Sequence, residues 1–142
     1  TGASVVATAT PSTPPAPPKA LAAGDKLEWL PTYEEALGRA RKEKKLVLLD
    51  FYTDWCGWCK RLDKDVFAEE SFQKAAGGVL AVKVNAEKVP QLAQRFKVSS
   101  FPRLFFLNAE GVTVERIHGY LNLADFTTRV QAVNQQEGVS CN

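Results

Sequence analysis

The sequence lacks several features that would direct it to particular functions. Its 142 residues include a single histidine, His118, and no apolar run approaches the roughly 18 residues that a membrane-spanning helix requires. The net charge is +2, and the one basic run, residues 39–45, is interrupted by Glu43. This run is typical of the solvated end of a helix. Without clustered lysines and arginines, we do not expect a nucleic-acid partner.

Methionine is absent altogether, so we expect that a leader has been removed or that the sequence is a piece of a longer chain. Residues 1–25 are rich in proline, alanine and threonine and lack the apolar content to fold alone. They are predicted to form a disordered, flexible tether, either an inert linker or a spacer to a membrane anchor or preceding domain. Residues 26–138 are predicted to form one folded domain, and 139–142 a C-terminal tail.

Cysteine is scarce and odd in number, since only Cys56, Cys59 and Cys141 are present. A structural disulfide between Cys56 and Cys59 would close too small a loop to remove much unfolded-state entropy. Zinc usually needs four ligands, and the chain offers only Cys141 and His118 besides the pair, so no metal site is expected. The C-x-x-C spacing therefore favours a redox pair. We interpret Cys141 as an incidental thiol rather than a regulatory one.

The cysteine pair directly follows the most apolar stretch of the chain. Residues 46–52 form a near-continuous apolar run, typical of a strand buried on both faces. The run breaks at residues 53–55, and Cys56 and Cys59 then stand at a predicted helix start. The partial positive charge of a helix N-terminus favours a thiolate over a thiol. Cys56 is therefore the candidate nucleophile, with Cys59 one turn further into the helix.

The remaining periodicities predict the order β-α-β-α-β-α-β-β-α, an α/β fold with a mixed sheet and helices on both faces. Thr32 and Glu35 have the spacing of a capping box, and Asn122 is a candidate N-cap for the last helix. The last two strands are predicted to form an antiparallel hairpin. The predicted strands are 27–30, 46–52, 79–85, 103–107 and 112–117, and the predicted helices begin near 32, 56, 69, 90 and 122. Residues 27–30 could instead be a packed lead-in to the domain.

The segment 50–60, DFYTDWCGWCK, resembles the active-site segment of the thioredoxin superfamily. Lys83 falls where that family has a lysine beside its buried aspartate, Phe101-Pro102 where it has a cis-proline, and Gly119 where it has a glycine after the hairpin. The likeness covers about residues 27–132. It implies a thioredoxin fold, a central mixed β-sheet flanked by helices.

Two positions depart from thioredoxin proper. Trp58 stands where thioredoxin has proline, and Arg103 stands where threonine is common. In these respects the chain is similar to bacterial thioredoxin-like proteins with a W-C-x-W-C-K sequence. It is also similar to the C-terminal domain of the transmembrane thiol-disulfide interchange proteins.

The resemblance implies a role for each residue of the redox site. Cys56 would attack a disulfide as a thiolate, and Cys59 would resolve the resulting mixed disulfide. Asp50 would accept the proton of Cys59 through water, with Lys83 tuning its pKa, because burial raises the pKa of a carboxyl group. The alternative is that Asp50 and Lys83 form a structural ion pair or point to solvent from strand ends.

The resemblance also implies a substrate site around a cis Phe101–Pro102 bond, whose backbone would pair with an extended substrate chain. An ordinary turn proline is the alternative. An apolar collar would surround the cysteines, although its two tryptophans could instead pack on the domain itself. His118 is given no role. The predicted substrate-site residues are Trp55, Gly57, Trp58, Phe101, Pro102, Gly119 and Tyr120.

The resulting hypothesis is a monomeric thiol-disulfide oxidoreductase that reduces protein disulfides and uses no bound cofactor. It would need a thiol electron donor, and a membrane reductase is the candidate. The tether, the missing start and the odd cysteine count favour an extracytoplasmic location. The alternatives are a disulfide oxidase or isomerase, or a non-catalytic binding or chaperone module that keeps the fold to hold extended chains.

Overall fold

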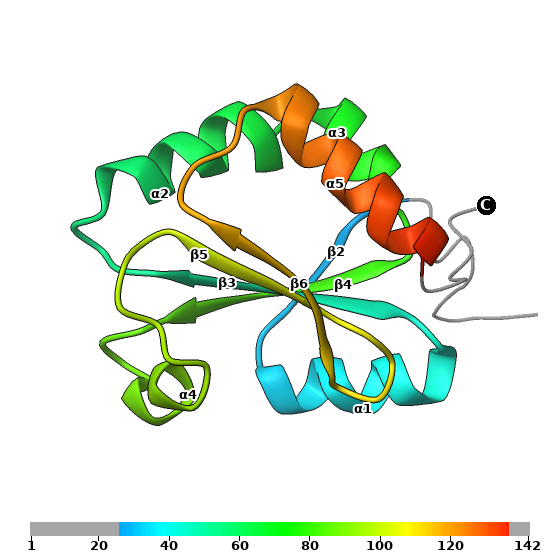
Figure 1. The fold of residues 1–142 in the computed structure, drawn as a ribbon, viewed down its shortest axis with the longest axis horizontal. Coiled ribbons are helices and arrows are strands. Elements are labelled where there is room, and N and C mark those ends of the chain that lie inside the picture. The colour runs from blue at the N-terminus through cyan, green and yellow to red at the C-terminus, as the bar shows by residue number, and fades with distance from the viewer. Residues whose placement is uncertain (1–25, 137–142) are drawn as a thin grey trace, which may run out of the picture.

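The computed structural model describes residues 26–136 (Figure 1). The predicted tether, the predicted tail with Cys141 and the last two residues of the predicted domain lie outside this range. One five-stranded sheet has the order β2-β4-β3-β5-β6. Strands β2, β4 and β3 are parallel, whereas β3–β5 and β5–β6 are antiparallel, which confirms the predicted mixed sheet. The strands are β2 (Glu28–Leu30), β3 (Leu46–Tyr52), β4 (Val79–Asn85), β5 (Arg103–Leu107) and β6 (Thr113–His118).

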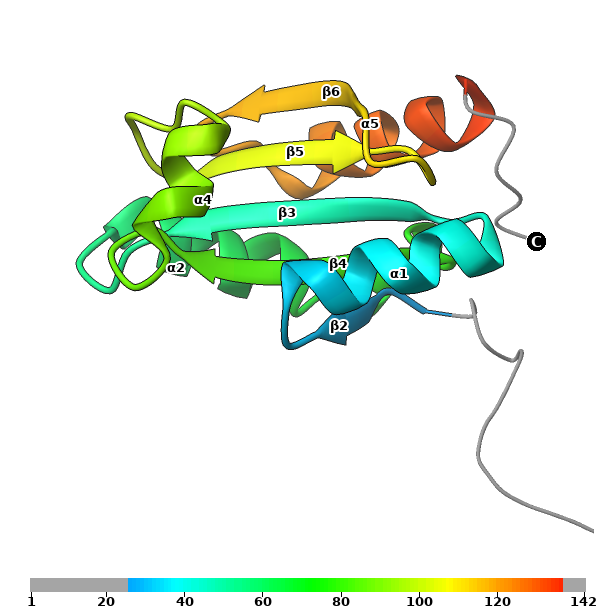
Figure 2. The ribbon, with the colours of Figure 1, turned by 90° about the horizontal axis from the view of Figure 1, so that it is seen from below.

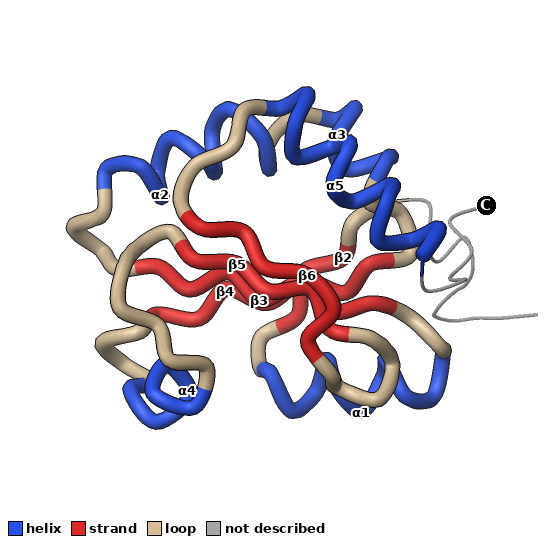
Figure 3. The backbone as a smooth tube through the Cα atoms, in the orientation of Figure 1, coloured by secondary structure: helices blue, strands red, loops and turns tan. Residues whose placement is uncertain are grey.

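Helices cover both faces of this sheet, as Figures 1 and 3 show. One face carries α1 (Tyr33–Glu43) and α4 (Pro90–Arg95). The other carries α2 (Gly57–Leu62), the π-helical turn η2 (Asp63–Phe67), α3 (Glu70–Ala75) and α5 (Leu123–Gln136). Within residues 26–136, no helix combines the length and apolar character that crossing a membrane requires.

Strand β3 lies between two separate hydrophobic cores. Because side chains alternate along a strand, Leu46 and Leu48 pack under α2, η2, α3 and α5, whereas Val47, Leu49 and Phe51 pack under α1 and α4. The prediction that this strand is buried on both faces is confirmed. The same alternation assigns position 50 to the α2 face of the sheet.

Three phenylalanines, one each from η2, α3 and α5, pack together on the α2 face of the sheet. The ring of Phe67 lies 5.6 Å from Phe72 and 5.5 Å from Phe126, and Phe72 and Phe126 are 5.1 Å apart. All three side chains are buried. Their packing therefore holds η2, α3 and α5 together on this face of the sheet.

Local signals at the helix ends act as predicted, with one correction. Thr32 Oγ1 accepts the backbone N–H of Glu35 at 3.1 Å, and Asn122 Oδ1 accepts that of Asp125 at 2.8 Å. The helix predicted to begin near residue 56 is not one regular helix. After residue 62 the helix widens into η2, where the N–H of Ala68 bonds to the carbonyl of Asp63, because a π turn spans five residues rather than four.

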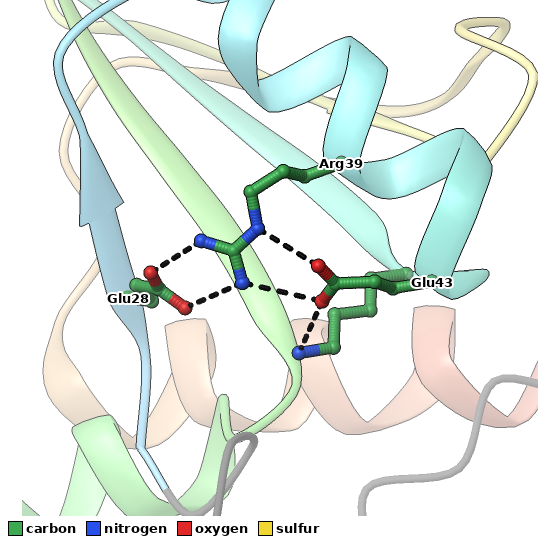
Figure 4. A network of polar contacts seen from close by, with 4 residues as sticks. Glu28, Arg39 and Glu43 are labelled. Atoms are coloured by element: carbon green, nitrogen blue, oxygen red, sulfur yellow. Dashed lines mark hydrogen bonds and ion pairs between the residues drawn. The ribbon is translucent and has the colours of Figure 1, made fainter. Parts of the chain in front are cut away.

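A polar network ties the short edge strand to α1 (Figure 4). The guanidinium of Arg39 donates to Glu28 of β2 at 2.5 and 3.1 Å and to Glu43 at 2.9 and 3.2 Å. Lys45 also lies 3.1 Å from Glu43. These contacts, above all the hydrogen bond from Arg39, lower the pKa of Glu43 to about 2. The network therefore helps to hold β2, which has only three residues, against the rest of the fold.

Candidate active site

The cysteine pair lies at the junction between β3 and α2. Cys56 is the N-cap residue of α2, and it forms a disulfide with Cys59, with the two Cα atoms 5.3 Å apart. The Sγ of Cys56 accepts the backbone N–H of Cys59 at 3.1 Å. The predicted position of the pair at a helix start therefore matches the structure.

This capping contact has a chemical consequence for Cys56. A sulfur at the N-cap position faces backbone N–H groups that have no partner within the helix. Once the disulfide opens, those donors and the helix dipole favour the thiolate of Cys56. Only 5% of Cys56 and 4% of Cys59 is exposed, so the sulfur of a substrate must come close to the surface at Cys56 in order to react with it.

Asp50 is buried in the core on the α2 face, with 1% of its surface exposed. Its Oδ2 lies 3.3 Å from the Nζ of Lys83, its direct neighbour in the β3–β4 register, while its Oδ1 has no hydrogen-bond partner among the described residues. Burial raises the pKa of Asp50 to about 6. The positive charge of Lys83 opposes this rise, and the negative charge of Asp63 adds to it.

Asp63 is a part of this cluster that was not predicted. Its carboxylate forms an ion pair with Lys83, which therefore lies between Asp50 and Asp63. The side chain of Lys83 is about one-third exposed, so it reaches the edge of the core rather than its centre. Asp63 follows Cys59 by four residues, which places both on one helix face, but this spacing does not name Lys83 as the partner of Asp63.

The two tryptophans beside the cysteines each pack on one neighbour and still face outward. The ring of Trp55 lies 5.9 Å from that of Phe101, and the ring of Trp58 lies 5.3 Å from that of Tyr120. Nevertheless 66% of Trp55 and 56% of Trp58 is exposed. The packing of each ring on the domain agrees with one of the two interpretations made from the sequence, and the other, an apolar collar for a substrate, stays a prediction.

Polar contacts from distant segments set the positions of these aromatic rings. Trp55 donates its ring N–H to Glu87 at 2.9 Å, and Tyr120 donates its hydroxyl to Asp65 at 2.7 Å. The latter bond lowers the pKa of Asp65 and raises the pKa of Tyr120. Glu87 and Asp65 were not predicted. Glu87 follows strand β4 in a turn, where no local pattern marks it as a partner of Trp55.

The loop before β5, at Phe101–Pro102, and the loop after β6, at Gly119–Tyr120, are joined by a backbone hydrogen bond. The Phe101–Pro102 peptide bond is cis, and the Pro102 carbonyl accepts the backbone N–H of Gly119 at 2.9 Å. Gly119 has a φ of 89°, which favours glycine over other residues. Through Phe101 and Tyr120, these loops contact the tryptophans on either side of Cys56. The loops and the cysteine segment therefore form one surface.

His118, to which the sequence assigned no role, lies outside this cluster. It ends β6, is exposed, and pairs in register with Arg103 on the α1/α4 face. Among residues 26–136, no three His, Cys, Asp or Glu side chains gather in a way that could hold a metal ion.

The chain matches the family profile described as "Thioredoxin-like domain" over residues 33–134. It is 31% identical over 107 residues to the thiol:disulfide interchange protein DsbD of Pasteurella multocida, covering 71% of this chain and 19% of that protein. The corresponding protein of Klebsiella pneumoniae is 32% identical over 104 residues, covering 69% of this chain and 17% of that protein. The chain thus spans about a fifth of the length of these curated relatives.

Two solved structures of similar proteins cover most of the chain. A DsbH oxidoreductase superposes with a TM-score of 0.67 at 26% identity, covering 80% of this chain and 88% of that one. A thioredoxin from Thermus thermophilus superposes with a TM-score of 0.69 at 26% identity, covering 80% of this chain and 91% of that one. The fold expected from the sequence is confirmed.

The raised pKa of Asp50 predicts a stability effect that depends on pH. A carboxyl group that binds its proton more tightly when folded opposes folding once it ionises. The Asp50→Asn variant of the disulfide form should therefore be more stable than the unmodified protein at pH 7, by on the order of 2 kcal/mol. The advantage should disappear below about pH 4, where Asp50 is protonated in both folded and unfolded chains. Urea unfolding at both pH values measures it.

Asp63→Asn supplies the matched control for this experiment. It removes the negative charge beside Asp50 and leaves Lys83 to Asp50 alone, so the titration midpoint of the Asp50 carboxyl carbon in NMR should fall. Equal stability of Asp50→Asn and the unmodified protein at pH 7 would contradict the raised pKa of Asp50. So would an Asp50 titration midpoint near the ordinary aspartate value.

Proposed function

The chain belongs to the thioredoxin-like domain family, and we propose that this thiol-disulfide oxidoreductase reduces protein disulfides through the dithiol form of Cys56 and Cys59. The observation that carries the proposal is the Cys56–Cys59 disulfide at the start of α2, with the Cys56 sulfur in the helix cap. A disulfide that closes so short a loop contributes little to stability, so its position at a helix start serves reactivity rather than folding.

The reaction transfers two electrons in two exchange steps. The Cys56 thiolate attacks one sulfur of the substrate disulfide, which forms a mixed disulfide and releases the other substrate sulfur as a thiolate that takes up a proton. Cys59 then loses its proton and attacks Cys56. The second substrate sulfur leaves, and the Cys56–Cys59 disulfide forms. An external thiol donor must reduce that disulfide before the next cycle.

Asp50 fits the role of proton acceptor for Cys59 in the second step. Its pKa of about 6 lets it hold a proton briefly near neutral pH, and its Oδ1 has no partner among the described residues. Lys83 limits the rise in the pKa of Asp50, so that the carboxylate is available to accept the proton. We assign the transfer to an intervening water molecule.

The surface around the cysteines supports an extended protein chain as the substrate. Trp55 and Trp58 expose large apolar areas on either side of Cys56, and the ring of Phe101, in the loop with Pro102, packs on Trp55. A chain in β conformation can pair with such a loop by main-chain hydrogen bonds while its side chains contact the aromatic rings. Gly57, Gly119 and Tyr120 complete this surface.

The direction of transfer, the location and the donor are further parts of the proposal. The name of the curated relatives, thiol:disulfide interchange protein, supports exchange with other proteins. We propose an extracytoplasmic monomer that uses no bound cofactor and is re-reduced by a thiol donor, for which a membrane reductase is the candidate. A disulfide oxidase or isomerase would use the same residues with a different reduction potential, so the potential decides between them.

Substitution of each cysteine tests the two exchange steps separately. With dithiothreitol as donor, the protein should accelerate the reduction of insulin, and Cys56→Ser should abolish the acceleration. Cys59→Ser should stop at the mixed disulfide, which non-reducing electrophoresis and mass spectrometry detect. Cys141→Ser serves as the control and should retain activity. Acceleration that survives Cys56→Ser would rule out the proposed nucleophile.

The reduction potential tests the direction of transfer. The Cys56–Cys59 pair is equilibrated with glutathione buffers, and its redox state is monitored by tryptophan fluorescence. The reduction potential should be about −270 mV, the range of a reductase. A value near about −120 mV, typical of a strong oxidant, would contradict the proposed direction.

The proton-transfer role of Asp50 predicts a rate effect. General base catalysis typically contributes a factor of about a hundred or more, so Asp50→Asn should slow insulin reduction at pH 7 by at least about tenfold. The loss should shrink at higher pH, where hydroxide can remove the proton of Cys59. A pH profile of turnover for Asp50→Asn and Asp63→Asn measures this. A purely structural role for Asp50 would leave the profile of Asp50→Asn parallel to that of the unmodified protein.

A further inference from the structure

A groove of about 620 Å³ lies on the α1/α4 face of the sheet, over β5 and β6. Its lining contains no acidic residue. Figure 2 looks onto this face, with α1 and α4 in front of the sheet. We call it the basic groove, after five lining residues that carry or can carry positive charge: Arg95, Lys97, Arg103, Arg116 and His118.

Strand alternation explains why three of these side chains share one face. Arg103 and Phe105 alternate with Leu104 and Phe106, which belong to the core under α2 and α5. In the register of the hairpin, Arg103 is opposite His118 and Phe105 is opposite Arg116. The hairpin therefore presents its basic side chains away from the cysteine helix, and the segment at the end of α4 adds two more.

The basic groove holds charge that the described chain does not neutralise. Within residues 26–136, none of Arg95, Lys97, Arg103 and Arg116 forms an ion pair. In addition, the buried Nε of Arg103 has no hydrogen-bond partner in this part of the chain. Seven other basic residues of the same part have carboxylate partners, and six have none: Arg41, Lys42, Lys44, Lys60, Lys64 and Lys88. None of those six lines this groove, so the basic groove differs in gathering its unpaired charges in one place.

The basic groove begins next to the loop that flanks the cysteines. Arg103 directly follows Pro102, and Phe101 packs on Trp55 beside Cys56. Since a strand advances about 3.3 Å per residue, the length of β5 matches four or five residues of an extended chain. A substrate chain that lies on the loop can therefore continue along the hairpin into the groove.

We propose that the basic groove binds an acidic segment of the protein whose disulfide is reduced. Carboxylates a few residues from the substrate cysteine would pair with the guanidinium groups of Arg103 and Arg116. Arg95, Lys97 and Arg116 are exposed and line an open groove rather than an enclosed cage, which suits a peptide segment better than a small anion. The proposal rests on the proposed reductase function and specifies its substrate class.

Two disulfide peptides with the same core sequence test the proposal. One carries glutamates on both sides of the disulfide and the other carries glutamines, and kcat/KM is measured with dithiothreitol as donor. At low salt the acidic peptide should be reduced about tenfold faster, mainly through a lower KM. The double variant Arg103→Gln, Arg116→Gln should remove this advantage and leave the glutamine peptide within about twofold. Arg41→Gln, at the exposed end of α1, is the matched control and should keep the advantage.

Salt and a free anion complete the test. Raising the salt from about 0.01 M to about 1 M shortens the screening length from about 30 Å to about 3 Å, so the advantage should vanish. Equal rates for both peptides at low salt would overturn the proposal, as would an advantage that survives the double variant. Calorimetric binding of inorganic pyrophosphate without any preference between the peptides would also overturn it, in favour of a small-anion site. If neither peptide is reduced and Cys56→Ser makes no difference, it is the reductase function itself that fails.

Discussion

The burial of β3 on both faces is the constraint on which the rest of the structure depends. Every residue from Leu46 to Phe51 is buried, and at position 50 that burial falls on a carboxylate. A charged group in such a place is costly unless a partner compensates it. Lys83 supplies a partner from the neighbouring strand, but only to one oxygen, and the pKa of Asp50 rises to about 6. The fold thus places a carboxyl group with a raised pKa on the face of the sheet that α2, the helix with Cys59, covers.

The same central strand divides the molecule into two chemically different faces. On the α2 face lie the cysteines, Asp50 and the large phenylalanine cluster, all of them buried. On the α1/α4 face, the hairpin turns Arg103 and Arg116 toward a groove without acidic residues. The loop at Phe101–Pro102 stands between the two faces, since its aromatic ring contacts Trp55 and its next residue enters the groove. One extended chain can therefore contact both.

Trp58, where the chain departs from thioredoxin proper, is explained by its neighbours. Its ring rests on Tyr120, the guanidinium of Arg61 lies 5.5 Å from the ring centroid, and Asp65 holds both Arg61 and the hydroxyl of Tyr120. A large aromatic side chain between the cysteines is thus supported by residues from α2, η2 and the loop after β6. This support leaves more than half of the tryptophan exposed at the place where a substrate chain would lie.

The sequence alone determined the α/β architecture, the order of the elements, the caps at Thr32 and Asn122 and the position of the cysteine pair, because each follows from local periodicity or spacing. The thioredoxin fold and the candidates Asp50 and Lys83 came from the resemblance to a known family. The sequence did not determine the π turn at 63–67, the partners Asp63, Asp65 and Glu87, or the gathering of Arg95, Lys97, Arg103 and Arg116 around one groove. Those depend on strand register and helix placement, which bring together residues up to 55 positions apart, as in the bond from Tyr120 to Asp65. Only tertiary packing decides such contacts, because a charged side chain on the surface has no local pattern that names its partner.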